Sequence, residues 1–186
     1  MYSETKARLT YRRKLLAALR SSVFLKFRRK SYEAPFSNRD LILKGAGVQL
    51  DARLARRVHI LFTGWYGRAS TDDGVEFGIS IDRSYNIAEG KLKIKADTGD
   101  SDFSIWLKLR RRAYTSSNSL DTSHHGRSDL KWKAGVDYAH HLSKKVKLLA
   151  EGKFKDKSSS RETGVLEDDV IPYRGFSLGV GLRIDL

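Results

Sequence analysis

The sequence predicts an all-β fold, an antiparallel transmembrane β-barrel of about 10–12 strands with a basic lumen. Three observations favour it: polar and apolar residues alternate along most of the chain, the alternating runs are long, and none is apolar throughout. Most runs have about 10–14 residues, whereas strands of soluble proteins typically have about 5–6. At roughly 3.3 Å per residue, about 10 tilted residues span the apolar band of a membrane barrel. A membrane helix would need roughly 18 consecutive apolar residues, which the chain lacks.

Alternation defines about ten strands within a single domain, residues 1–186. In chain order they cover residues 6–12, 23–28, 40–54, 58–68, 75–85, 91–96, 102–112, 129–138, 143–157 and 176–186. Polar or glycine-containing joints such as 71–74 and 98–100 separate the runs. Longer polar loops are expected at 115–127 and 157–171, and only residues 13–19 have a helical pattern. Short and long joints should alternate in an outer-membrane barrel, but this order slips around the seventh run, which leaves the strand count open.

The C-terminal run shows the two faces most clearly. Its apolar face holds Phe176, Leu178, Val180, Leu182, Ile184 and Leu186, and its other face holds Ser177, Gly179, Gly181, Arg183 and Asp185. The same alternation fits a soluble barrel with an apolar interior or a membrane barrel with an apolar exterior. Strand length, aromatic residues near run ends such as Tyr66 and Tyr114, and the mixture of small and large apolar residues favour the membrane barrel.

The charge indicates an anionic partner. Lys and Arg number 36 against 22 Asp and Glu, a formal net charge of +14, which suits nucleic acid, anionic lipid or small phosphorylated solutes. The absence of cysteine excludes disulfides, thiolate metal sites and cysteine nucleophiles.

Basic residues occupy the face opposite the apolar one in several runs. The residues predicted to line a pore and bind anions are Lys26, Arg28, Lys91, Lys93, Lys95, Lys108, Arg110, Arg112, Lys131, Lys133, Lys145, Lys147, Lys153, Lys155 and Arg183. Low-dielectric walls would focus the field of these cations into the bore, and Lys and Arg donate directly to phosphate oxygens. Phosphate and phosphorylated metabolites are therefore the expected solutes.

Other motifs have plainer interpretations. The pairs His124-His125 and His140-His141 lack the spacing of a metal site, and Gly45-Ala46-Gly47 lacks the third glycine of a dinucleotide loop. The acidic segment 167–169 is interpreted as solvated loop charge that could repel anions at one mouth. Nothing places a nucleophile beside a base, so we expect no enzymatic activity, no cofactor and no metal.

Some stretches resemble the plastid outer-envelope 21-kilodalton anion channel family. Arg183-Ile184-Asp185-Leu186 is similar to the family's C-terminal pattern of Arg, aromatic, Asp and Leu, with Ile184 in the aromatic position. Residues 45–51 and 129–135 resemble two further family strands. Membership would imply a small β-barrel that passes phosphate and triose phosphates across the plastid outer envelope, with nucleotides such as ATP blocking the basic bore. The implied partners are membrane lipids and small phosphorylated anions.

Two alternatives stay open. The first is a barrel subunit of an outer-envelope lipid or protein translocation complex. The second is a soluble basic β-protein that binds nucleic acid, with Trp65, Trp106 and Trp132 as exposed stacking platforms. The pore interpretation expects no nucleic acid, and the sequence leaves the oligomeric state open.

Overall fold

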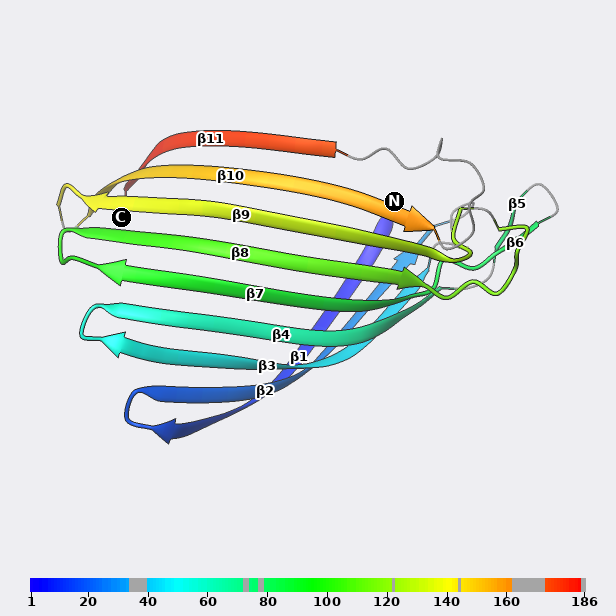
Figure 1. Ribbon diagram of the computed structural model, residues 1–186, viewed down its shortest axis with the longest axis horizontal. Coiled ribbons are helices and arrows are strands. Elements are labelled where there is room, and N and C mark those ends of the chain that lie inside the picture. The colour runs from blue at the N-terminus through cyan, green and yellow to red at the C-terminus, as the bar shows by residue number, and fades with distance from the viewer. Residues whose placement is uncertain are drawn as a thin grey trace.

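The computed structural model describes residues 1–33, 40–71, 74–76, 79–121, 123–143, 145–161 and 173–184. These residues form a nine-stranded antiparallel sheet and a separate two-stranded hairpin (Figure 1). The strands are β1 (Tyr2–Leu16), β2 (Leu19–Tyr32), β3 (Leu41–Ala55), β4 (Val58–Thr71), β5 (Gly74–Glu76), β6 (Ile79–Ile81), β7 (Tyr85–Asp97), β8 (Ser101–Tyr114), β9 (Arg127–His141), β10 (Val146–Arg161) and β11 (Tyr173–Ile184). The predicted all-β class is therefore confirmed.

The sheet is a meander in which each strand pairs with its neighbours in the chain. Its order is β1-β2-β3-β4-β7-β8-β9-β10-β11, and β5 pairs with β6 outside it. The sheet of the described residues has nine strands, fewer than the predicted 10–12, because the predicted strand 75–85 does not form a strand of the sheet. Residues 74–76 and 79–81 form β5 and β6, and Tyr85 begins β7.

Tight turns lie at one end of the sheet and longer connections at the other (Figure 1). Short turns join β1 to β2, β3 to β4, β7 to β8 and β9 to β10. In the turn between β7 and β8, Gly99 has a φ of 93°, and its N–H donates to Asp97 Oδ1 at 2.6 Å. When 75–85 is not counted as a strand of the sheet, short and long connections between successive strands alternate along the whole chain.

The segment 13–19 forms a strand turn in place of the expected helix. Residues up to Leu16 belong to β1, and Leu19 begins β2 after a turn at Ala17-Ala18. Arg13 pairs with Ser21 and Lys14 with Arg20, so the period-2 pattern continues to the turn. Strand pairing along this edge therefore overrides the helical propensity of a seven-residue segment, which is too short to be a stable helix alone.

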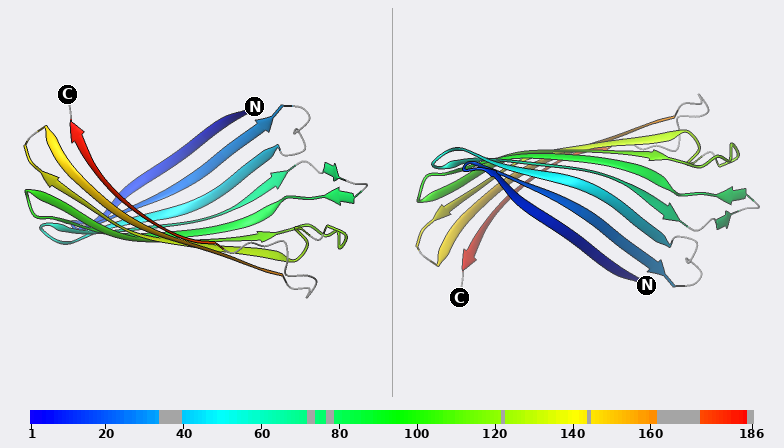
Figure 2. Two further views of the ribbon diagram at one scale, coloured as in Figure 1. Left: turned by 90° about the horizontal axis from the view of Figure 1, so that it is seen from above. Right: turned by 90° about the horizontal axis from the view of Figure 1, so that it is seen from below.

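The sheet is curled (Figure 2). Side chains alternate between a largely polar face with the less exposed residues, which we call concave, and a largely apolar face with the more exposed residues, which we call convex. Side chains on the convex face are exposed, including Leu9, Val23, Val48, Phe62, Leu92, Ile105, Leu107, Val136, Leu148 and Val180. In β11 the convex row comprises Phe176, Leu178, Val180, Leu182 and Ile184, as the alternation predicts. Exposed apolar side chains therefore occur on this face in each of the nine strands of the sheet.

A small apolar core lies on the concave face. Phe24, Leu43, Trp65, Ala69 and Ile87 pack together there, and Leu43, Ala69 and Ile87 lie in the parts of β3, β4 and β7 nearer the longer connections. Glycines make room for the large rings: a Cβ at Gly45 would lie 2.6 Å from the Tyr66 carbonyl oxygen and 3.2 Å from the Trp65 ring. The motif 45–47 is thus a packing feature of β3.

The sheet is open in this structure. Within the described residues, β1 and β11 each have one hydrogen-bonded neighbour, β2 and β10 respectively. The two edge strands lie on either side of the concave face (Figure 2).

Candidate functional site

The concave face gathers the predicted basic residues. The strand registers place the following side chains on it: Lys26, Arg28, Lys91, Lys93, Lys95, Lys108, Arg110, Arg112, Lys131, Lys133, Lys147, Lys153, Lys155 and Arg183. Lys145 is an exception, because it is exposed in the turn before β10. Ser143 Oγ accepts hydrogen bonds from the N–H groups of Lys145 and Val146 at 3.2 and 3.1 Å, and so the strand begins at Val146.

Four of these residues form a row across neighbouring strands. Lys91 of β7 is directly opposite Lys108 of β8, which is opposite Lys133 of β9, which is opposite Lys155 of β10. We call this set the lysine row. Neighbouring strands lie about 4.8 Å apart, and like charges in directly opposed positions destabilise a sheet. The row is therefore a site whose electrostatic repulsion a bound anion would relieve.

A second basic row runs beside the lysine row. Arg110 of β8 is opposite Lys131 of β9, which is opposite Lys157 of β10. These residues line a cavity of about 240 Å³ together with Arg112, Asp129 and Tyr173. The Lys131 ammonium donates to the Tyr173 hydroxyl at 2.5 Å. Basic donors from three strands thus converge on a space of the size of a small anion.

Asp129 is the acidic member of this cavity. Its carboxylate accepts from Arg127 Nε at 2.8 Å and from the Ser159 hydroxyl at 2.6 Å, and it lies 3.7 Å from Lys157 Nζ. These contacts orient the carboxylate toward the end of the cavity where β9 begins, at Arg127. The positive donors Arg110 and Lys131 lie on the side of the lysine row.

Glu89 separates the basic rows from the apolar core. Its carboxylate accepts from Trp65 Nε1 at 3.1 Å and from Arg110 Nε at 2.6 Å, and it lies 2.8 Å from Lys108 Nζ. The Glu89 side chain is 12% exposed. One carboxylate therefore fixes the positions of two cations that belong to different basic rows.

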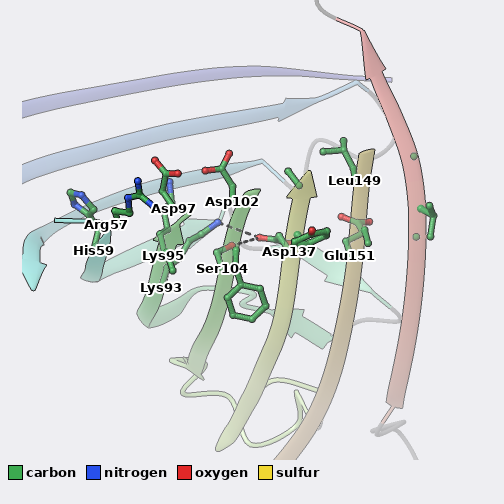
Figure 3. A pocket seen from close by; sticks show the side chains of 18 of the residues that line it. Arg57, His59, Lys93, Lys95, Asp97, Asp102, Ser104, Asp137, Leu149 and Glu151 are labelled. Carbon is green, nitrogen blue, oxygen red and sulfur yellow. Dashed lines mark hydrogen bonds and ion pairs between the residues drawn. The ribbon is translucent and has the colours of Figure 1, made fainter. Parts of the chain in front are cut away.

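A wider cavity of about 600 Å³ lies at the tight-turn end of the concave face (Figure 3). Lys93 Nζ is 3.2 Å from Asp137 Oδ2, which also accepts from the Ser104 hydroxyl at 3.0 Å. Figure 3 shows Arg57 and His59 on the same side of the cavity and Glu151 across it. Both signs of charge line this region.

Aromatic rings support several of the cations. Lys26 Nζ lies 4.2 Å from the centre of the Trp65 ring, and Lys91 Nζ lies 5.5 Å from that of Trp106. The Arg8 guanidinium lies 4.0 Å from the centre of the Phe24 ring. These contacts fit cation–π interactions and hold the cations against the concave wall.

Sequence reasoning missed some members of this face. Arg8, Arg12 and Lys157 share it with the predicted residues, as the registers of β1 and β10 show. The signal was present, since residues 6–12 and 143–157 were both expected to be alternating strands. Every second residue of a strand lies on the same face, so applying the alternation to the whole of each run places these three residues with the predicted ones.

The histidines form local contacts. His124 Nδ1 lies 2.9 Å from Asp121 Oδ1, and His141 Nε2 lies 3.1 Å from Asp102 Oδ2. His140 lies on the convex face and His141 on the concave one. Within the described ranges, no group of three or more His, Cys, Asp or Glu could hold a metal ion. The acidic segment 167–169 lies outside the described residues.

The tryptophans are not exposed platforms. Trp65 is buried, Trp106 covers Gly135, and Trp132 packs on Phe154 with ring centres 4.8 Å apart. Trp132 also lies on the convex face, away from the cations. The expected exposure of the three tryptophans is therefore wrong.

No family model matches the chain, and no curated protein matches it significantly. No helix among the described residues is long and apolar enough to cross a membrane.

Proposed function

We propose that the protein is an anion-selective β-barrel pore that passes phosphate and phosphorylated metabolites such as triose phosphates. The observation that carries this proposal is the lysine row, in which four cations are directly opposed across β7, β8, β9 and β10. Directly opposed like charges destabilise a sheet, and of the four lysines only Lys108 has a carboxylate partner within 4 Å among the described residues, Glu89 at 2.8 Å, so a bound anion would relieve the remaining repulsion. Phosphate groups supply the charge and the acceptor oxygens that these donors need.

The convex face supports a membrane location for the pore. Exposed apolar side chains lie on it in all nine strands of the sheet, with Leu178 at 76% and Val180 at 80%. On this face, the cations Lys44, Arg68 and Arg111 lie in the parts of their strands nearer the longer connections. The strands have 12–16 residues, long enough to cross the apolar band of a membrane. Short turns at one end and longer connections at the other are typical of outer-membrane barrels.

The basic rows define how solutes would pass. Phosphate would exchange water for Lys and Arg donors along the concave wall, and the close spacing of the donors would let it move from one to the next. A polyvalent anion such as ATP would contact several cations at once and block the smaller solutes. Glu89 and Asp137 would weaken the binding of anions to the neighbouring cations, so that a bound anion could leave the site and move on through the pore.

The plastid outer envelope is the membrane we propose. The support is the resemblance of Arg183-Ile184-Asp185-Leu186 and residues 45–51 to the plastid anion channel family. Association of the protein with carbonate-washed outer-envelope membranes would test this location. Recovery in the soluble fraction would contradict it.

The pore is tested by planar-bilayer recording of the purified chain in a KCl gradient. The reversal potential should have the sign of anion selectivity. Replacing Lys108, Lys133 and Lys155 together with Gln should move it toward zero and weaken block by ATP. The matched control replaces Lys44, Arg68 and Arg111 with Gln, which removes the same charge from the convex face. Equal effects of the two triple variants would contradict the proposal. A chain that conducts only with co-purifying proteins would favour a translocation subunit.

A further inference from the structure

The two edges of the sheet have unused hydrogen-bonding capacity. β1 (Tyr2–Leu16) pairs with β2 alone, and β11 (Tyr173–Ile184) pairs with β10 alone. The outer edge of each strand therefore presents a row of backbone N–H and C=O groups. In the apolar part of a membrane each unsatisfied group costs several kcal/mol, so open edges do not persist there.

The number of strands fixes the direction of any closing pair. Successive strands of the nine-stranded meander are antiparallel, so β1 and β11 run the same way, from the longer connections to the tight turns (Figure 1). We propose that β1 and β11 pair with each other in parallel and close the sheet into a barrel with one parallel seam. This inference rests on the proposed membrane location and adds the partner of each edge.

Barrel geometry sets the register of the seam. A path across the sheet from each residue to its directly opposed partner on the next strand leads from Ser177 of β11 to Lys14 of β1. It passes through Lys153, Gly135, Trp106, Lys93, Leu61, Asp51 and Arg20. In a closed barrel of nine strands, spaced about 4.8 Å apart and tilted near 40°, the residue met across the seam is shifted by about 10 positions from the residue that the direct path reaches. We call this shift the offset. The offset must be even so that the polar faces meet. It places Ser177 beside Glu4 and not beside Lys14.

Side-chain sizes fit this register on the concave face. It sets Gly175, Gly179 and Gly181 opposite Tyr2, Lys6 and Arg8. A Cβ at Gly175 or Gly181 would meet nothing within 4 Å among the described residues, so the open sheet does not require glycine there. Elsewhere on this face, glycines receive rings from neighbouring strands, as Gly135 receives Trp106. The long side chains of β1 would occupy the glycine positions of β11 in the same way.

Charge and the convex face agree with the same offset. Offsets of about 8 or 12 residues would set Arg183 beside Arg12 or Arg8, whereas an offset of about 10 sets it beside Thr10. On the convex face, Phe176, Leu178 and Val180 would lie opposite Ser3, Thr5 and Ala7. Large side chains of one edge would thus lie beside small ones of the other.

Disulfide trapping tests the seam, because the chain has no cysteine of its own. The variant Lys6→Cys with Gly179→Cys should form an intramolecular disulfide on oxidation of the full chain in lipid vesicles. It would be seen as a shifted monomer band on a non-reducing gel. The matched control, Lys6→Cys with Gly175→Cys, separates the thiols by about 13 Å along the strand, beyond disulfide reach. Arg8→Cys with Gly181→Cys provides a second pair in the proposed register.

The outcomes separate the seam from the pore. Efficient disulfides in both in-register pairs, with little in the control, support the seam. Free thiols in both pairs, or preferential linkage of the control, would overturn it, and disulfide-linked dimers would show that a second copy takes the edge. Anion conductance is measured on the same vesicles. Conductance without the disulfide overturns the seam alone, and the disulfide without conductance overturns the pore alone.

Discussion

A single arginine on β11 distinguishes a lipid-facing convex face from a water-facing one. Val180 lies near the middle of β11, opposite Ala150, and is 80% exposed. Because the Val180 side chain is so exposed, the change in unfolding free energy caused by Val180→Arg depends mainly on whether lipid or water surrounds it. Arg at the midplane of a membrane barrel costs about 2–4 kcal/mol, a factor of roughly 30–1000 in the unfolding equilibrium. On a surface in contact with water the same change would usually stay within about 0.5 kcal/mol.

The assay is urea unfolding of the chain in lipid vesicles, with Ser177→Arg as the matched control. Ser177 lies on the concave face of the same strand, beside Lys153, so this variant adds the same side chain to the opposite face. We expect a cost below about 1 kcal/mol there, since the added charge stays in water. Equal costs at both positions would refute the assignment of faces. A negligible cost for Val180→Arg would refute the membrane location.

Three further predictions concern the concave face. Glu89→Gln should cost about 1–3 kcal/mol of stability, measured by unfolding, because Lys108 and Arg110 lose their shared negative charge and one of the two acceptor oxygens becomes an NH2 donor. The variant should also strengthen ATP block, and unchanged block would show that Glu89 does not weaken anion binding at the basic rows. Gly47→Leu should destabilise the fold by about 1–3 kcal/mol, since its Cβ would collide with Phe24 and Trp65. Gly90→Leu, where a Cβ meets nothing within 4 Å, should have little effect in the same measurement. Raising KCl from about 0.1 to 1 M should weaken ATP block in bilayer recordings as the Debye length falls from about 10 to 3 Å, and block insensitive to salt would exclude the basic rows as its site.

Face assignments were predictable from the sequence because alternation is encoded within each strand. Every predicted basic residue that lies on a strand has the expected parity, and so does the convex row of β11. Errors occurred where local pattern and pairing conflict. The pattern of 75–85 predicts a sheet strand, but β5 and β6 pair with each other outside the sheet, and the apolar residues of 13–19 form part of a strand turn.

The lysine row itself was not predictable, because it depends on the register between strands. A shift of two residues between β8 and β9 would preserve the faces and place Lys108 opposite Lys131 or Gly135. The contacts of Glu89 with Trp65 have the same origin, since they join strands that are separate in sequence. Registers follow from turn geometry and side-chain packing across strands, which a single sequence does not display.

The odd number of strands has a consequence for topology in the cell. Strand β1 starts at Tyr2 on the side of the longer connections, and β11 ends at Ile184 on the side of the tight turns. In a membrane that the proposed pore spans, these two residues would face different compartments. A protease added to intact organelles should then cleave an epitope tag placed next to one of these residues and spare a tag placed next to the other.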